Sequence, residues 1–197
     1  MNDNVTKPTT VASVLASELS TDELSALFEY IDSPLIVKGL VNSWPIVKAS
    51  ELSTQNAVDY LKQFAIPMQV GVGKVPPSAQ GRLFYNEHFS GFNFSRSSES
   101  FDGFIDALAK TIDGNGYYMG STHIDKLLPN FRLKNDLDAL AQKSALASIW
   151  ISNQTQISAH QDLPNNVACC VAGKRRFTLF PPEQVENLYI GPLDLTP

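Results

Sequence analysis

This sequence has few cysteines and no long apolar segments, which argues against a disulfide-bonded protein and against a membrane protein. The 197 residues include only two cysteines, Cys169 and Cys170, which are adjacent. Neighbouring cysteines can bridge each other only under strain, and neither has a distant partner. We therefore predict buried thiols in a reducing compartment. No apolar run approaches the roughly 18 residues of a membrane span, and the first residues show no basic region followed by an apolar one. We expect a soluble cytoplasmic protein with no membrane contact.

Positive charge is also limited. The chain has 15 Lys and Arg residues against 20 Asp and Glu residues, which gives a net charge of −5. The basic residues are scattered except at Lys174, Arg175 and Arg176, so we expect no extended cationic surface for a phosphate backbone. The charge argues against nucleic acid as a partner.

What the sequence does contain is the composition of a folded domain. Hydrophobic residues make up 43% of the chain and charged residues 18%, which are ordinary values for a globular protein. A chain of this length can bury a substantial core in one domain but is short for two. With no internal repeat, low-complexity tract or linker, we predict a single domain over residues 1–197.

The first half of the chain predicts a mixture of helices and strands. Ser20 and Glu23 have the spacing of a capping box ahead of an amphipathic helix. The run that begins at Pro34 indicates a short buried strand that turns at Gly39. Further predicted helices cover residues 53–64 and 100–112, and further predicted strands cover residues 66–73, 81–86 and 116–121.

From Ala145 onward the strand signals dominate. Before this point, residues 123–140 predict an irregular to helical stretch that Pro129 breaks. The later runs are short, β-rich and separated by turn residues, which is typical of an antiparallel sheet or barrel; they cover residues 145–152, 156–160, 166–172 and 175–180. A short helix and a proline-rich ending follow. We predict an α+β fold with a mainly β core.

His160 and Asp162 are the first candidates for a functional site. Residues i and i+2 of a strand point to the same side, so an imidazole and a carboxylate at this spacing converge on one point. Such a pair can supply two of the three ligands of a non-haem iron site, which also needs a distant histidine. A polar turn at the end of a strand remains the alternative.

A second pair has the same spacing. His123 and Asp125 also stand two residues apart, but no pair of strand signals follows them. We interpret this second pair as a polar loop rather than a metal site.

The order of residues around His160 extends beyond the metal pair. Ser-Ala-His-x-Asp at 158–162 is followed by Asn166, an apolar run, the basic turn at 173–176 and Phe-Thr-Leu-Phe-Pro-Pro at 177–182. This order resembles the JmjC-related cupin-like proteins. The segments at 33–45, 81–94, 117–131 and 181–194 resemble the same family, so the resemblance covers about residues 34–197.

The resemblance implies a fold and a reaction. The fold would be a double-stranded β-helix, the jelly roll of the cupins, with an N-terminal α/β part over residues 1–144 and the first core strands over residues 145–197. The reaction would be an Fe(II)-dependent hydroxylation in which 2-oxoglutarate is decarboxylated to succinate. The resemblance makes His160 and Asp162 metal ligands.

The resemblance also implies contacts to the co-substrate. Tyr118 matches a tyrosine that hydrogen-bonds 2-oxoglutarate, although a core aromatic is an equal alternative. Asn166 falls where relatives place a polar group near the co-substrate, or it forms a turn with Asn165. Relatives often use a lysine to bind the distal carboxylate; Arg175 stands at that position and can bind a carboxylate with two hydrogen bonds. A threonine of the family is replaced by Ile157.

The metal site departs from the family pattern as well. The family's second ligating histidine lies on a later core strand, which this sequence does not contain, while His88 and His123 lie upstream. We therefore expect an incomplete domain whose unpaired strands could associate in a homodimer through the open sheet edge.

Three functions stay open at this point. The first is that the chain is an incomplete Fe(II)- and 2-oxoglutarate-dependent hydroxylase domain, inactive by itself or active on a protein side chain, an RNA base or a small molecule. Alternatively, it is a cupin-like module that binds a ligand or partner without turnover, or a structural cupin in which His160 is only a polar residue.

Overall fold

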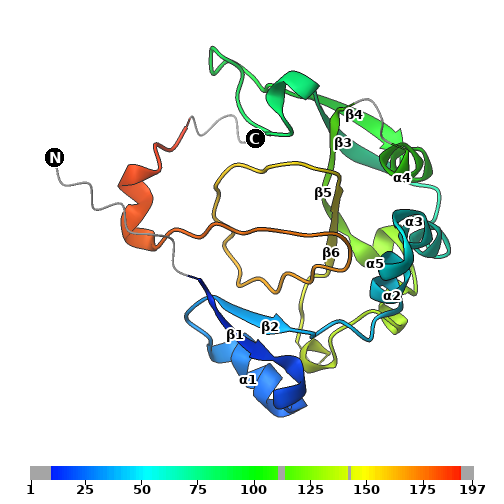
Figure 1. Ribbon diagram of the computed structural model, residues 1–197, viewed down its shortest axis with the longest axis vertical. Coiled ribbons are helices and arrows are strands. Elements are labelled where there is room, and N and C mark those ends of the chain that lie inside the picture. Colours follow the sequence, from blue (N-terminus) through cyan, green and yellow to red (C-terminus); the bar gives the residue numbers. More distant parts are fainter. Residues whose placement is uncertain (1–9, 111–113, 142, 192–197) are drawn as a thin grey trace.

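Two sheets and a group of helices make up the described part of the chain. The structure is a computed structural model that describes residues 10–110, 114–141 and 143–191 (Figure 1). The strands are β1 (Ala12–Leu15), β2 (Leu35–Lys38), β3 (Gln69–Val75), β4 (Ser95–Ser100), β5 (Gly116–His123) and β6 (Ser148–Ser152). The α-helices are α1 (Thr21–Tyr30), α2 (Pro45–Leu52), α3 (Thr54–Lys62), α4 (Phe101–Ala109) and α5 (Ile124–Leu127). Short 3-10 helices are η1 (Ala16–Glu18), η2 (Pro77–Ala79), η3 (Phe131–Leu133), η4 (Asp138–Leu140) and η5 (Pro182–Asn187).

The N-terminal unit confirms the capping-box prediction. The Glu23 backbone N–H donates to the Ser20 hydroxyl oxygen at 3.2 Å, and the Ser20 backbone N–H donates to the Glu23 carboxylate at 2.8 Å. These two bonds satisfy backbone donors that the first turn of α1 leaves without helical partners. Strand β2 also forms where the apolar run predicted it, and it pairs in parallel with β1.

Helices α2 and α3 are only partly as predicted. Ser53 caps α3 by accepting a hydrogen bond from the Asn56 backbone N–H at 3.0 Å, as the helix start at Ser53 required. Helix α2, by contrast, was not predicted. It begins at Pro45, whose fixed φ suits the first helical position, and its Ile46 and Val47 are buried.

The larger sheet is antiparallel and has the strand order β4-β3-β5-β6. The apolar runs predicted β3, β5 and β6, but they gave no signal for β4, which is almost entirely polar and mostly exposed. The strand predicted at residues 81–86 is wrong, because this segment forms only isolated bridges at Arg82 and Tyr85. A strand needs a continuous hydrogen-bonded neighbour, and the described residues give this segment none.

The hydrophobic core lies between the larger sheet and the helices. Alternate residues of each strand face the helices, so Val70 and Val72 of β3 and Met119 of β5 join the buried core. Helices α2 to α5 lie on this side of the sheet (Figure 1). The fully buried side chains include Phe101, Phe104, Ile46, Ile105, Leu127 and Leu128. Helices α2 to α5 do not cover the opposite face of the sheet (Figure 1).

The segment after β6 corrects three predicted strands. Residues 156–160, 166–172 and 175–180 form no named strand; only Gln156 makes an isolated bridge, to Arg82. These residues run as extended chain beside the sheet face that the helices do not cover (Figure 1). The runs have strand propensity, but no neighbouring chain in the described residues supplies the ladder bonds that make a strand. The 3-10 helix η5 agrees with the short helix predicted near residue 182.

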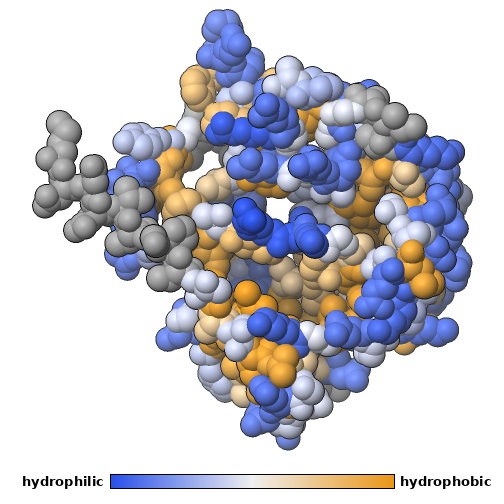
Figure 2. All heavy atoms as spheres, viewed as in Figure 1, coloured by the Kyte–Doolittle hydropathy of each residue, from blue (hydrophilic) through white to orange (hydrophobic). Residues whose placement is uncertain are grey.

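Apolar side chains of this segment are exposed. Phe177 is 62% exposed, Leu179 55% and Phe180 50%. Figure 2, which has the same view as Figure 1, shows the molecule hollowed near its centre, with both hydrophobic and hydrophilic residues around the hollow. A jelly roll would cover these side chains with further strands, so the described structure establishes a mixed fold with an antiparallel sheet and not a closed barrel.

Both cysteines are free thiols, but only one fits the prediction of burial. Cys169 is half-buried, and desolvation raises the pKa of its thiol to about 11, with a smaller contribution from the charge of Asp136. Cys170 is exposed, because residues 167–172 do not enter a sheet. In the described ranges no helix has the length and apolar character to cross a bilayer.

Candidate functional site

A row of residues crosses the sheet on the face opposite the core. Gly73 of β3 lies in register with Arg96 of β4 and with Tyr118 of β5, and Tyr118 lies in register with Ser152 of β6. Residues in register on neighbouring strands project to the same face. On this face, Arg96 therefore lies on one side of Gly73 and Tyr118 lies on the other.

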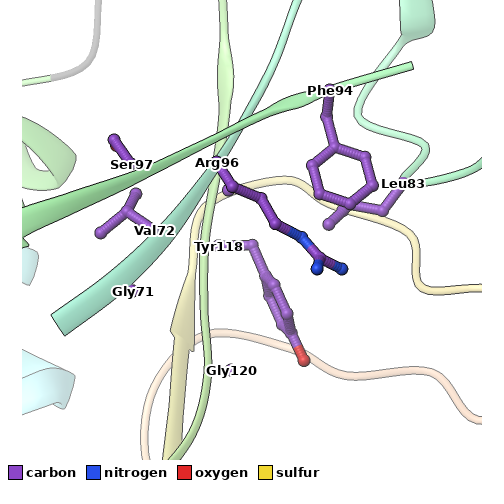
Figure 3. Close-up of a pocket in the computed structure, with 9 residues that line it drawn as sticks. Gly71, Val72, Leu83, Phe94, Arg96, Ser97, Tyr118 and Gly120 are labelled. Carbon is purple, nitrogen blue, oxygen red and sulfur yellow. The ribbon is translucent and has the colours of Figure 1, made fainter. Parts of the chain in front are cut away.

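A pocket opens at this row. Its volume is about 280 Å³, and its walls include Arg96, Tyr118, Phe94 and Leu83. Figure 3 shows Arg96 and Tyr118 leaving strands on opposite sides of β3 and extending toward the same side. Tyr118 is thus a pocket residue rather than a core aromatic, and its neighbour Tyr117 is the one that packs against the hydrophobic core.

His160 and Asp162 come together in the segment after β6. The Nε2 atom of His160 lies 4.0 Å from an Asp162 carboxylate oxygen, and both side chains are more than half exposed. The other carboxylate oxygen of Asp162 accepts a hydrogen bond from the Asn166 side-chain amide at 2.9 Å. The two side chains therefore approach each other as predicted, although residues 160–162 form no strand.

The backbone fixes which ring nitrogen of His160 can bind a ligand. The Nδ1 atom lies 2.8 Å from the carbonyl oxygen of Ser158. A carbonyl oxygen only accepts, so Nδ1 must carry the proton, and Nε2 keeps its lone pair toward Asp162 in the neutral ring. A metal-ligating histidine is commonly oriented in this way.

The distance between the two side chains is longer than that between two neighbouring ligands of one metal ion. Bonds of about 2.0–2.2 Å at octahedral or tetrahedral angles place two ligand atoms about 3.0–3.5 Å apart, so the 4.0 Å gap would shorten when a metal ion binds. One imidazole and one carboxylate are two of the three ligands of a non-haem Fe(II) site. The described residues, however, contain no group of three His, Cys, Asp or Glu side chains that could hold a metal together.

Two hydrogen bonds tie the His160 segment to the pocket wall. The Leu83 backbone N–H donates to the Gln156 carbonyl oxygen at 3.0 Å, and the Ser158 hydroxyl donates to the Leu83 carbonyl oxygen at 2.9 Å. Leu83 is buried and lines the pocket. The segment that carries His160 is therefore anchored beside Tyr118 and Arg96 although it belongs to no sheet.

Tyr118 lies within electrostatic reach of two other predicted site residues. Burial raises the pKa of its hydroxyl, the charge of Arg175 lowers that pKa, and the charge of Asp162 raises it. The charges of Arg175 and Asp162 therefore act on the Tyr118 hydroxyl, although neither residue lines the pocket.

The residues predicted to contact the co-substrate differ in their exposure and in their contacts. Arg175 is exposed, and its guanidinium carbon lies 5.8 Å from the centre of the Phe177 ring. Asn166 donates a hydrogen bond to the Asp162 carboxylate, and in the described part of the chain no hydrogen bond joins it to Tyr118. Ile157, at the position of the family's threonine, is half-buried.

Sequence reasoning missed two residues of the pocket, Arg96 and Gly73. Arg96 lies in a polar stretch that predicts no strand, and Gly73 looked like an ordinary strand residue. Their proximity to Tyr118 follows only from strand register, which pairs Gly73 with residues 23 and 45 positions further along the chain and leaves no local signal. The one sequence signal for the pocket was the pair of glycines, Gly71 and Gly73, at alternate positions of β3.

The second His-x-Asp pair is used structurally. His123 is the last residue of β5 and Asp125 lies in α5, rather than in the polar loop that was predicted. Asp125 forms an ion pair with Arg132 at 3.1 Å. The Nδ1 atom of His123 is buried with no hydrogen-bond partner among the described residues. His88 is exposed on the loop after Tyr85.

The comparison with protein families identifies the domain. The family model of the cupin-like domain matches residues 23–197, which is most of the chain. The chain therefore belongs to the family of cupin-like domains, in agreement with the motif around His160.

Three curated relatives are similar at low identity. Two are tRNA wybutosine-synthesizing protein 4 from Aspergillus oryzae, 26% identical over 51% of this chain, and from Gibberella zeae, 22% identical over 81%. The third is JmjC domain-containing protein D from Dictyostelium discoideum, 22% identical over 80% of this chain. The matched regions cover only 11%, 16% and 37% of these three relatives, respectively. The JmjC-related character inferred from the motif is thus supported by a named relative.

Proposed function

We propose that this chain is a hydroxylase domain that uses Fe(II) and 2-oxoglutarate, built on the core of a double-stranded β-helix. The observation that carries the proposal is the 4.0 Å approach of His160 Nε2 to Asp162, with the proton of the ring held on Nδ1 by Ser158. Membership of the cupin-like family and the similarity to a JmjC protein support the same chemistry.

Each site residue has a defined role in the proposal. His160 and Asp162 would hold the ion, and the Asn166 amide keeps one Asp162 oxygen oriented so that the other faces His160. Arg175 would take the distal carboxylate of 2-oxoglutarate, because a guanidinium can donate two parallel hydrogen bonds to it. The Tyr118 hydroxyl, whose pKa burial raises further above neutrality, would donate a further one. When bound, the ion and 2-oxoglutarate would supply the oxidising power that converts a substrate C–H bond to an alcohol with O₂.

Anaerobic titration with Fe(II), with and without 2-oxoglutarate, tests the proposal. The chelate of Fe(II) with 2-oxoglutarate should give a weak visible charge-transfer band in the wild-type chain. His160→Ala should abolish the band, since it removes one of the two ligands. His88→Ala is the matched control, because His88 is an exposed histidine on a loop outside the pocket.

Two results would contradict the proposal. An equally strong band in His160→Ala would show that iron binds elsewhere. No iron binding by the wild-type chain would show that His160 and Asp162 do not hold the ion.

A second candidate is a cupin-like module that binds without turnover. Two observations favour it: the described residues hold no group of three metal-binding side chains, and the segment after β6 exposes apolar side chains such as Phe177 and Leu179. Iron binding that depends on His160 but yields no succinate from 2-oxoglutarate, with or without added substrate candidates, would favour this module. Succinate formation would favour the hydroxylase.

The substrate class is the remaining part of the proposal. Two relatives are tRNA wybutosine-synthesizing proteins, which makes tRNA one candidate, whereas a net charge of −5 argues against strong nucleic-acid binding by this chain. Succinate release measured in parallel with tRNA, peptides and small acids distinguishes the three classes.

A further inference from the structure

The floor of the pocket contains glycines that the backbone does not require. Gly71 and Gly73 of β3 and Gly120 of β5 line the pocket. Among the described residues the glycines with positive φ are others, so these three have backbone angles that other amino acids also adopt. Glycine weakens the interior of a strand relative to residues with a side chain. The sheet therefore loses stability at these positions and gains the space that the missing side chains leave.

The open part of this floor is at Gly71. A Cβ atom added at Gly71 would meet nothing within 4 Å. A Cβ atom added at Gly73 would meet the Phe94 side chain at 3.5 Å, and one added at Gly120 would meet the Tyr118 ring at 3.5 Å. Aromatic side chains thus cover Gly73 and Gly120. Close packing within the described residues does not explain Gly71, and the space above it is room for a ligand.

The walls of this space are apolar and mostly aromatic. Phe94, Leu83 and the Tyr118 ring line the pocket, and Figure 3 shows their side chains on the same side of the strands. Aromatic rings attract one another in offset and edge-to-face arrangements by more than their buried area alone would give. The walls therefore favour an aromatic ring over an aliphatic group of the same size. Only the ring of Tyr118 is used, so its hydroxyl can still contact 2-oxoglutarate.

The same walls favour an uncharged ligand. Arg96 lines the pocket, but its guanidinium carbon lies 4.3 Å from the centre of the Phe92 ring and 5.5 Å from that of Phe94. Arg96 is thus engaged with these rings, and no other charged side chain belongs to the described residues of the wall. A charged group placed against glycine and phenylalanine would lose its hydration without compensation.

The volume of the pocket limits the size of the ligand. It is about 280 Å³. A cavity of about 150 Å³ holds one benzene molecule, and pockets for drug-sized ligands begin at about 300 Å³. The pocket therefore suits one ring with a few substituents.

We propose that this pocket binds a small uncharged aromatic molecule, with its ring over Gly71 and against the rings of Phe94 and Tyr118, and that this molecule is the substrate of oxidation. The last clause rests on the proposed function. The side chain absent at Gly71 is the feature that admits the ring.

Binding of phenol to the metal-free chain tests the pocket separately from the iron site. Phenol is uncharged at pH 7, and cyclohexanol is its aliphatic counterpart with the same hydroxyl group. Ligand-detected NMR titration should show phenol binding with a dissociation constant of about 1 mM. Cyclohexanol should bind more weakly by about two- to tenfold, because it has no aromatic contact with the walls.

Variants at Gly71 separate the ligand space from the stability of the strand. Gly71→Val should weaken phenol binding by about fivefold or more, because its side chain fills the space. It should also raise the urea midpoint of unfolding, since valine favours a strand and the Cβ position is open. Gly71→Ala should change both quantities in the same directions by less. Gln69→Val is the matched control, because Gln69 is exposed two residues earlier in β3 and does not line this pocket. It should bind phenol like the wild-type chain.

Phe94→Leu tests the aromatic wall. Leucine keeps the wall apolar, so cyclohexanol should bind as it does to the wild-type chain, whereas the preference for phenol should fall. An unchanged preference would show that Phe94 does not contact the ring and would contradict the placement.

Four outcomes would overturn the proposal or its link to oxidation. Absence of phenol binding, or equal binding by the wild-type chain and Gly71→Val, would overturn the pocket. Cyclohexanol that binds as tightly as phenol would overturn the aromatic class. Displacement of phenol by 2-oxoglutarate in the metal-free chain would assign the space to the co-substrate. Phenol binding that depends on Gly71 in a chain without iron binding would retain the pocket and reject the hydroxylase.

Discussion

The hydroxyl of Ser158 donates a hydrogen bond to the carbonyl oxygen of Leu83 at 2.9 Å, across 75 residues of sequence. Ser158 also supplies the carbonyl oxygen that fixes the ring of His160. The candidate metal ligand therefore owes its position to the pocket wall.

Replacing Ser158 by Ala tests this dependence. The backbone bond from Leu83 to Gln156 remains, so the segment should stay near the sheet, but His160 should become less ordered. We expect a loss of about fivefold in Fe(II) affinity, close to the value of one hydrogen bond. Anaerobic titration measures it, and Ser98→Ala on the exposed side of β4 is the control. Unchanged affinity would mean that the Ser158 hydroxyl does not position the ligand.

A buried asparagine stabilises the packing of α2 and α3. Asn135 is 3% exposed; its side-chain oxygen accepts from the Ile46 backbone N–H at 3.1 Å, and its amide donates to the Tyr60 hydroxyl and the Phe131 carbonyl at 3.0 Å each. Asn135→Ala would leave these groups buried without partners, so we expect the free energy of unfolding to fall by about 2–4 kcal/mol. Tyr60→Phe removes only one of the three bonds and should cost about 1 kcal/mol. Urea denaturation followed by far-UV circular dichroism gives both values, and equal losses would contradict the prediction.

Two glycines with nearly equal φ separate backbone strain from steric overlap. Gly39 has φ +79° with only the Asn42 side chain near its missing Cβ, whereas a Cβ at Gly81 would overlap the backbone oxygen of Gln154. Gly39→Ala should cost about 1–2 kcal/mol, the strain of a left-handed residue with a side chain. Gly81→Ala should cost more and should displace the chain that leads to His160. Thermal unfolding ranks the two variants, and a Gly39→Ala loss equal to or larger than that of Gly81→Ala would refute the steric reason.

The two cysteines should differ in reactivity. The pKa of Cys169 is raised to about 11 by burial, so only about one thiol in a thousand is ionised at pH 8. Cys170 is exposed. Iodoacetamide at pH 8 should therefore modify Cys170 first, as peptide mass spectrometry will show with Cys170→Ser as the control. Equal rates at both positions would contradict the burial of Cys169.

The raised pKa of Cys169 predicts how the free energy of unfolding changes with pH. The folded-state pKa of about 11 lies above the ordinary value of 9.0, so the folded chain holds this proton more tightly than the unfolded chain. The stabilisation is complete below pH 9 and is lost as the pH rises through about 11. Cys169→Ser should flatten the fall in stability between these two pH values.

Local patterns predicted the elements whose signals are local. The capping box placed the start of α1, and apolar runs placed β3, β5 and β6, because side-chain spacing and caps act within a few residues. Helix α2 and strand β4 were missed because their local signals are weak. Strand β4 has few apolar residues, since it pairs with β3 at the rim of the sheet and leaves most of its side chains in solvent.

The strands expected between residues 156 and 180 show the limit of such patterns. Their composition favours extended chain, and extended chain is what the structure has. Whether extended chain becomes a strand depends on a partner elsewhere, which composition cannot supply.

The sequence by itself determined the family motif and the convergence of His160 with Asp162, because two residues two positions apart on extended backbone share a side whatever surrounds them. It also determined the net charge and the absence of a distant disulfide partner for Cys169 or Cys170. Only the tertiary structure decided that Arg96, Gly73 and Tyr118 form one row, since strand register joins segments that carry no mark of each other. The pocket is a product of that register, and its function depends on residues that lie far apart in the chain.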